Sequence, residues 1–337
     1  MKKLLFAILL LTVFLQSCQK ETPPAFAKGA DVSWLPQMEA TGYQFLDENG
    51  QKADVLHLLK DRGMDAVRLR IFVNPSDNPW SGHCDKDATV AMALRAQKMG
   101  MQVMANFHYS DSWADPGKQN KPEAWKDLPF DELVQAVYDH TYEVVSALKN
   151  AGVTPEWVQV GNEIPGGMLW PDGHTDQWPQ LAQLLNAGYK ATKAVDPNIR
   201  VIVHVDEGHN QEKFRNFYDR ATELGVQYDI IGLSYYPYWV KKDWTETIDG
   251  LRQNLIDLVE RYDKDVMVVE VGGEDHQIEN TRDLLKATIE AVRNVPNGRG
   301  LGVFYWEPQG ARSWSKYGLS AWGEDGKPSP ALDAFKE

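Results

Sequence analysis

Cysteine is nearly absent, with 2 in 337 residues, at positions 18 and 84. Cys18 follows an apolar N-terminal run of the kind that precedes a lipid-modified cysteine. A lipid on Cys18 would leave Cys84 without a partner for a disulfide. If Cys18 carries lipid, we expect no internal disulfide even in an oxidising compartment. Its stability must therefore come from burial of a core, and a chain of this length buries enough apolar surface for that.

Positive charge is also scarce, since 35 Lys and Arg stand against 48 Asp and Glu, a net charge of -13. Binding to nucleic acid or to an anionic lipid surface requires a basic face, so the charge argues against both. The same charge makes a strongly anionic polymer an unfavourable substrate.

The glycine-rich loops of nucleotide enzymes are missing too. No Gly-x-Gly-x-x-Gly follows an apolar run, and there is no Gly-Lys-Ser/Thr loop. Such loops bring backbone N–H groups close to phosphates. Their absence argues against a dinucleotide or nucleoside triphosphate enzyme.

Only one long apolar run occurs, residues 4–15, directly after Lys2 and Lys3. It is too short to span a bilayer comfortably but is typical of a signal peptide. The run ends in Leu15-Gln-Ser-Cys18, which resembles a bacterial lipobox. We expect residues 1–17 to be a lipoprotein signal peptide, 18–25 a tether that starts at a lipid-modified Cys18, and 26–337 one folded domain.

This N-terminus sets the expected location. We expect export and lipid anchoring to the bacterial cell envelope, at the outer membrane or cell surface, with membrane contact only through the lipid. Plain secretion with an incidental Cys18 is the alternative. We further expect a monomer.

Aromatic residues, in contrast, are abundant: 12 Trp, 13 Tyr and 11 Phe. Several Trp stand beside polar, turn-forming residues, as in Asp111-Ser-Trp-Ala-Asp-Pro116. Flat rings beside carboxylates and amides suit sugar rings, which have an apolar face and a rim of hydroxyls. For any single Trp a place in the core is the alternative.

Short apolar runs alternate with helical patterns along the rest of the chain. The expected strands are residues 30–34, 66–73, 102–107, 157–160, 200–205, 230–234, 266–271 and 301–306. The expected helices are residues 54–62, 89–98, 133–150, 179–195, 211–224, 247–262 and 281–294, with Gly63, Gly100, Gly152 and Gly225 where four of them should end. About eight strand–helix units predict an α/β fold, a single (β/α)₈ barrel. A doubly wound sheet is the runner-up.

In a (β/α)₈ enzyme the catalytic groups lie at the C-terminal ends of strands. The polar and aromatic residues at those ends are Asp31, Trp34, Arg68, Arg70, residues 108–115, Asn162, Glu163, residues 204–207, residues 234–239, Glu270, Trp306 and Glu307. Glu163 and Glu270 directly follow apolar strands, where an unpaired carboxylate is costly. Two carboxylic acids are the minimum for glycoside hydrolysis, and Asn162 could bond a sugar hydroxyl beside the anomeric carbon.

The order of these residues resembles the retaining β-glycosidases with (β/α)₈ barrels, and within them glycoside hydrolase family 53, the arabinogalactan endo-β-1,4-galactanases. The matching stretches are Gly29-Ala-Asp-Val-Ser-Trp34, Val67-Arg-Leu-Arg-Ile-Phe-Val-Asn-Pro75, Asn106-Phe-His-Tyr-Ser-Asp-Ser-Trp-Ala-Asp-Pro116, Val160-Gly-Asn-Glu-Ile164, Asp229-Ile-Ile-Gly-Leu-Ser-Tyr-Tyr-Pro237 and Val268-Val-Glu270. The resemblance implies endo-acting hydrolysis of β-1,4-galactan or type I arabinogalactan, the side chains of pectin, with retained configuration.

The resemblance also implies roles for single residues. Glu163 would be the acid/base and Glu270 the nucleophile, kept ionised by Arg68, with Arg70 as the alternative. Tyr236 would hydrogen-bond the nucleophile, with Tyr235 as the alternative. The substrate-binding residues would be Asn162, His108 and Asp111 in the cleft floor, and Trp113, Trp306 and Trp314 as sugar platforms.

Two departures from the family pattern occur after Glu270. Val271-Gly-Gly273 stands where the family often has a small residue or threonine and then an aromatic. Residues 272–280 form a short loop where some bacterial members have a longer, calcium-binding one. Glu274, Asp275, His276 and Glu279 supply oxygens and nitrogens without a regular calcium-loop spacing. We therefore expect no metal and no cofactor.

Three rival functions differ in what they require. A related barrel hydrolase on mannan or xylan would keep both glutamates. A non-catalytic glycan-binding surface lipoprotein would keep the aromatic residues and lose the carboxylates. A barrel lyase or isomerase would commonly place a Lys or a metal at the strand ends, and no such set is evident.

Overall fold

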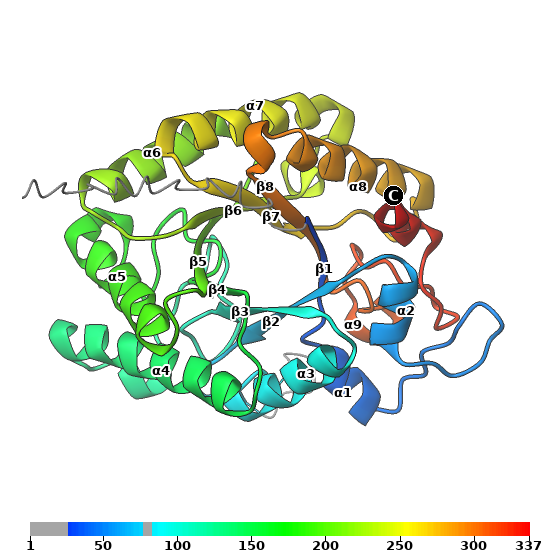
Figure 1. Cartoon of the computed structure of the whole chain (residues 1–337), viewed down its shortest axis with the longest axis horizontal. Coiled ribbons are helices and arrows are strands. Elements are labelled where there is room, and N and C mark those ends of the chain that lie inside the picture. The colour runs from blue at the N-terminus through cyan, green and yellow to red at the C-terminus, as the bar shows by residue number, and fades with distance from the viewer. Residues whose placement is uncertain (1–25, 77–82) are drawn as a thin grey trace, which may run out of the picture.

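The computed structural model describes residues 26–76 and 83–337, and its centre is a closed barrel of parallel strands. Each strand pairs with the next, and β1 pairs with β8 to close the ring, as Figure 1 shows from one end. The strands are β1 (Ala27–Asp31), β2 (Ala66–Ile71), β3 (Gln102–Phe107), β4 (Trp157–Val160), β5 (Arg200–Val205), β6 (Ile230–Tyr235), β7 (Asp265–Val271) and β8 (Gly300–Trp306). The expected single (β/α)₈ barrel is confirmed.

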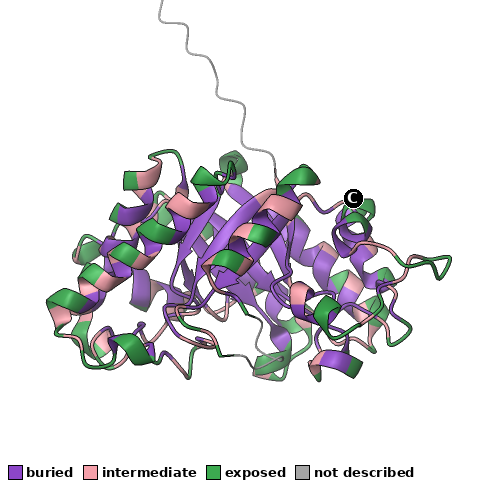
Figure 2. Cartoon of the chain, turned by 90° about the horizontal axis from the view of Figure 1, so that it is seen from below, coloured by how far each residue is buried: buried purple, intermediate pink, exposed green. Residues whose placement is uncertain are grey.

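Helices surround the barrel and turn their apolar sides toward it, so that buried residues face inward and exposed residues face outward (Figure 2). The α-helices are α1 (Leu35–Ala40), α2 (Val55–Asp61), α3 (Lys86–Lys98), α4 (Phe130–Asn150), α5 (Trp178–Val195), α6 (Gln211–Glu223), α7 (Trp244–Tyr262), α8 (Ile278–Arg293) and α9 (Arg312–Ser315). The short 3₁₀ helices are η1 (Glu123–Trp125), η2 (Thr175–Gln177), η3 (Pro237–Val240), η4 (Pro296–Gly298) and η5 (Pro330–Lys336). Among the described residues no helix is long and apolar enough to cross a membrane.

Glycines end several helices as the sequence predicts. Gly63, Gly100, Gly152 and Gly225 follow the C-caps of α2, α3, α4 and α6 with φ of 86°, 69°, 93° and 69°. A side chain is strained in this left-handed conformation, so glycine allows the chain to leave each helix and enter the next strand within a few residues.

The barrel interior near the N-terminal ends of the strands is filled by a separate apolar cluster. Its members are Ala27, Ala66, Met104, Trp157, Ile202, Ile230, Met267, Val269, Leu301 and Phe304. Gly29 leaves room for the Phe304 ring, because a Cβ at this position would lie 2.2 Å from a ring carbon. This packed plug leaves only the opposite end of the barrel open to substrate, which is the end expected for catalysis.

The first strand is the clearest difference from the expected boundaries. It spans Ala27–Asp31 rather than residues 30–34, because Trp34 already has helical dihedrals and caps α1. The apolar pattern continues through Val32 and Leu35, which are buried in the surrounding core, so hydrophobicity alone does not mark the strand end. Asp31 therefore stands at the end of β1, beside Arg68 of β2.

Candidate active site

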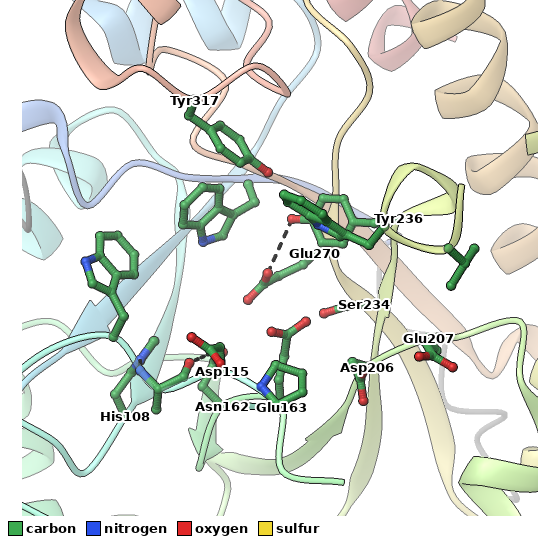
Figure 3. A pocket seen from close by; sticks show the side chains of 16 residues that line it. His108, Asp115, Asn162, Glu163, Asp206, Glu207, Ser234, Tyr236, Glu270 and Tyr317 are labelled. Carbon is green, nitrogen blue, oxygen red and sulfur yellow. Dashed lines mark hydrogen bonds between the residues drawn. The ribbon is translucent and has the colours of Figure 1, made fainter. Parts of the chain in front are cut away.

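A cavity of about 430 Å³ lies at the C-terminal ends of the strands. Its lining residues are His108, Trp113, Ala114, Asp115, Pro116, Asn162, Glu163, Asp206, Glu207, Ser234, Tyr236, Trp239, Val240, Glu270, Trp306 and Tyr317. Figure 3 shows Glu163 and Glu270 reaching into the same space from opposite sides. The structure thus brings together the two glutamates that the sequence singles out.

Glu163 is held by the turn after β4. Gly161 and Glu163 both have positive φ, 81° and 45°, which is uncommon for a residue with a Cβ and typical of functional turns. The Glu163 N–H donates to Nδ1 of His204 at 3.2 Å, so the ring proton must sit on Nε2, which lies 2.8 Å from the Ser234 hydroxyl oxygen. Ser234 is thereby free to donate its own proton to the Glu163 carboxyl.

The pKa of Glu163 is raised well above its ordinary value. The main cause is burial, which disfavours the charged carboxylate, and the nearby Glu270 raises it further, while the hydrogen bond from Ser234 acts in the opposite direction. Glu163 can therefore keep a proton at a pH where an ordinary glutamate has lost it. This is the property required of a general acid.

Glu270 lies near the C-terminal end of β7, and two donors contact its carboxylate. Arg68 Nη2 lies 2.8 Å from Glu270 Oε1, and the Tyr236 hydroxyl donates to Oε2 at 3.3 Å. Burial raises the pKa of Glu270, while the Arg68 cation and the two donors oppose that rise. Within the pair the proton belongs on Glu163 and the negative charge on Glu270.

These contacts decide between the alternatives that the sequence left open. Arg70 pairs with Glu307 at 2.7 Å and does not contact the nucleophile. Tyr235 is fully buried and bonds Thr247 at 2.8 Å, on the other side of the strand. Arg68 and Tyr236 are therefore the two that contact Glu270.

Arg68 also fixes Asn162. Its Nη2 donates to Asn162 Oδ1 at 2.8 Å, and Asp31 accepts from its Nη1 at 3.0 Å. Asn162 Nδ2 donates one of its two protons to the Ala114 carbonyl oxygen at 2.9 Å. The second proton of that amide remains to donate to a sugar hydroxyl, because an amide nitrogen has two.

Two of the predicted platforms line the cavity. Trp113 and Trp306 lie edge to face with ring centroids 5.7 Å apart, and the guanidinium of Arg70 lies 4.0 Å from the centre of the Trp113 ring. His108 also lines the cavity, and its Nδ1 accepts the Ala114 N–H at 3.0 Å. Burial and the two arginines lower the pKa of His108 well below its ordinary value, so it is neutral.

Two predicted binding residues do not line this cavity. Asp111 is not among the lining residues; its carboxylate accepts the backbone N–H groups of Asn74 and Glu123, both at 2.8 Å, and so braces the loop after β3. Trp314 is 7% exposed and packs with Trp34 in the core, and its Nε1 donates to Thr41 at 2.8 Å. Its role is packing, since its ring is covered.

The sequence does not predict a role for several other lining residues. Asp206, Ser234 and Trp239 belong to the strand-end segments but showed no pattern of their own. Tyr317 lies beyond the last strand and reaches the cavity through the loop after β8, where it contacts Trp306 at 4.8 Å between ring centroids. In residues 26–76 and 83–337 no group of three or more His, Cys, Asp or Glu could hold a metal ion.

Comparison with known proteins agrees with this site. The model of Glycosyl hydrolase family 53 matches residues 27–332. Among curated proteins, an "Uncharacterized protein in bgaB 5'region" of Niallia circulans is 40% identical over 89% of this chain and 88% of its own length. The Endo-beta-1,4-galactanase of Bacillus subtilis (strain 168) is 33% identical over 84% of this chain and 70% of its own. Among solved structures, the Ignisphaera aggregans GH53 catalytic domain superposes with a TM-score of 0.85 at 33% identity, covering 94% of this chain and 97% of that one.

Proposed function

The chain belongs to Glycosyl hydrolase family 53, and we propose that it hydrolyses β-1,4-galactosidic bonds within galactan chains with retention of configuration. The observation that carries this function is the unequal environment of the two glutamates. Arg68 and Tyr236 stabilise a negative charge on Glu270, whereas burial and that same charge favour the protonated form of Glu163. One group is thus ready to attack and the other to donate a proton.

In the first step Glu163 gives its proton to the glycosidic oxygen as the bond from that oxygen to the anomeric carbon breaks. Glu270 attacks the anomeric carbon from the opposite face and forms an ester with it. In the second step Glu163 takes a proton from water, the water oxygen bonds to the anomeric carbon, and the ester bond breaks. Two inversions leave the product in the β configuration.

Asn162 and the aromatic residues hold the substrate in this position. The free Nδ2 proton of Asn162 would bond the hydroxyl beside the anomeric carbon, where the bond strengthens in the transition state. Trp113 and Trp306 would pack against the apolar faces of the sugars. Lining residues come from the loops after β3, β5, β6 and β8, which supports a cleft across the barrel mouth and cleavage inside a chain.

The test is incubation with linear β-1,4-galactan, mannan and xylan, with product sizes and anomeric configuration followed over time. We expect a range of oligosaccharides from galactan alone in the first minutes, released as β anomers. Release of only galactose would contradict cleavage inside the chain. Activity on mannan or xylan without activity on galactan would reassign the substrate, and binding of galactan without hydrolysis would favour a glycan-binding lipoprotein.

We also propose that the enzyme is exported, lipid-anchored through Cys18 and monomeric. Support for the anchor comes from the apolar run at residues 4–15 and the lipobox-like Leu15-Gln-Ser-Cys18, which lie outside the described residues. Cys18→Ala should release active enzyme from membranes, and a variant that still partitions with membranes would refute the anchor. Light scattering of the released enzyme tests the monomer, and a molar mass of twice that of one chain would refute it.

A further inference from the structure

A second cavity, of about 560 Å³, lies beside the catalytic one. It is formed by the loop from β6 to α7, which contains η3, and by the loop from β7 to the start of α8. Trp239 of η3 lines both cavities, so the two meet at its side chain. A branched or extended glycan in the catalytic cleft could therefore reach the second cavity without leaving the protein surface.

Two exposed aromatic side chains form one wall of the second cavity. Tyr238 is 45% exposed and Trp239 61% exposed, and their ring centroids lie 4.8 Å apart at 80°. No other tryptophan in the described ranges is as exposed as Trp239. Leaving two adjacent large rings in water is unfavourable unless they serve a contact, and rings of this kind suit the apolar face of a sugar.

Two lysines stand next to these rings with their charges unneutralised. Lys241 and Lys242 are exposed, line the cavity and make no ion pair with any residue in the described ranges. Lys241 sits in a left-handed turn with φ of 57°, where its N–H bonds the Tyr238 carbonyl, so the backbone that carries the lysines is fixed. Lys241 and Lys242 thus place two adjacent positive charges at the wall of a cavity, in a chain whose net charge is -13.

The carboxylates of the cavity are already engaged by their own loops. Asp243 caps α7, where it accepts from Thr245 and from Asn280 Nδ2. Glu274 accepts from Gln277 Nε2 at 2.6 Å. These bonds hold the acidic groups in place at the helix ends, and the two lysine ammonium groups are the positive charges that an acidic ligand can pair with.

We propose that the second cavity binds a uronic acid residue of a glycan. The sugar ring would lie against Tyr238 and Trp239, and its carboxylate would pair with Lys241 and Lys242. The inference rests on the proposed function in one respect: the acidic sugar is taken to be part of the same polymer as the galactan chain that the enzyme cleaves. The negative charge of the whole protein disfavours a long polyanion, so the site takes a single acidic sugar or a short run of them.

The test is direct binding of a galacturonic acid trisaccharide, measured by calorimetry on the full-length enzyme. The trisaccharide contains no galactosidic bond to hydrolyse, and its methyl ester is a matched ligand without charge. We expect the acid to bind, and binding to weaken at least about tenfold in a Lys241→Gln/Lys242→Gln variant and in high salt. A Lys52→Gln/Lys190→Gln variant, which loses the same charge at exposed positions outside both cavities, should bind like the wild type.

Equal binding of the acid and its methyl ester, no binding of the acid, or equal binding by the Lys241/Lys242 variant would each overturn the proposal. Hydrolysis of neutral linear galactan is assayed in the same preparations and should be unchanged in both double variants. If the wild type fails to hydrolyse galactan yet binds the acid through these lysines, the proposed function is wrong and the site remains. Hydrolysis of galactan without lysine-dependent binding would overturn the site and leave the proposed function in place.

Discussion

Arg68 Nη2 lies 2.8 Å from Oε1 of Glu270, and both side chains are almost completely removed from solvent. An ion pair in such surroundings is not screened by water, so its charge acts strongly on the carboxylate. The same guanidinium bonds Asn162 and Asp31. One arginine thus links the nucleophile to the amide that faces the substrate.

Arg68→Lys should reduce kcat/KM by about 10²- to 10³-fold, because one ammonium nitrogen cannot replace both Nη1, which bonds Asp31, and Nη2, which contacts Asn162 and Glu270. Loss of the close contact between Arg68 and Glu270 also raises the pKa of that carboxyl, and the nucleophile must be ionised. The acidic limb of the kcat/KM profile should therefore move to higher pH. A profile unchanged in both height and position would contradict the role of Arg68.

The two glutamate variants should differ in kind. Glu163→Ala lacks the proton donor, so it should retain more activity on an aryl galactoside whose leaving group needs no proton. Its slow step becomes breakdown of the glycosyl-enzyme, which azide should accelerate to give a β-azide. Glu270→Ala cannot form that ester, and azide could yield only the α-azide. NMR of the azide products distinguishes the two, and a swapped outcome would exchange the roles.

Asp206 should raise the pKa of the general acid, Glu163. Its negative charge, next to Ser234 and Glu163 in Figure 3, raises the pKa of Glu163. Catalysis needs Glu163 protonated, so Asp206→Asn should lower that pKa and move the alkaline limb of kcat/KM to lower pH. Glu207→Gln is the control, because Glu207 shares Lys213 with Asp206 at the same 2.9 Å. An alkaline limb that stays in place in the Asp206 variant, or moves equally in both, would refute this tuning.

Glu307 should matter for stability rather than for proton transfer. It is fully buried, and its carboxylate accepts from Arg70 Nη1 at 2.7 Å and from the Trp34 N–H at 3.0 Å. Burial raises the pKa of Glu307 to about 8 while Arg70 opposes that rise, so the carboxylate is charged above that pH. At pH 9, Glu307→Gln leaves Arg70 with less buried negative charge and should lower the free energy of unfolding by about 3 kcal/mol or more. Glu143→Gln, which breaks the exposed pair with Lys86, should cost far less, because water screens that pair. Urea unfolding measures both, and equal losses would contradict the buried network.

Much of this architecture could be predicted from the sequence because it depends on local periodicity. The strands β3, β4 and β5 have the expected bounds, since each is a short apolar run between clear turn residues. Glu163 and Glu270 could be identified because desolvating a carboxylate at the end of a buried strand is too costly without a partner or a function. The strand end at Asp31 could not be predicted, since the apolar pattern continues into α1.

Side-chain partners were less predictable, because they depend on neighbouring strands. Arg68 and Arg70 lie on the same side of β2, so alternation cannot separate them, and only depth in the barrel decides which one reaches Glu270. Asp111 and Trp314 have the local sequence of binding residues, but folding pairs the first with two backbone N–H groups and covers the second. Neither outcome is determined by the adjacent residues.

The most direct test of the mechanism is to trap the glycosyl-enzyme. The reagent is a β-galactobioside with fluorine at the 2-position and a dinitrophenolate leaving group. Fluorine destabilises the transition state for both steps, whereas the leaving group accelerates only the first, so the glycosyl-enzyme should form faster than it hydrolyses. Peptide mass spectrometry should find the sugar esterified to Glu270, and the Glu270→Gln variant should remain unlabelled. A label on any other residue, or an α-configured first product from galactan, would contradict Glu270 as the nucleophile.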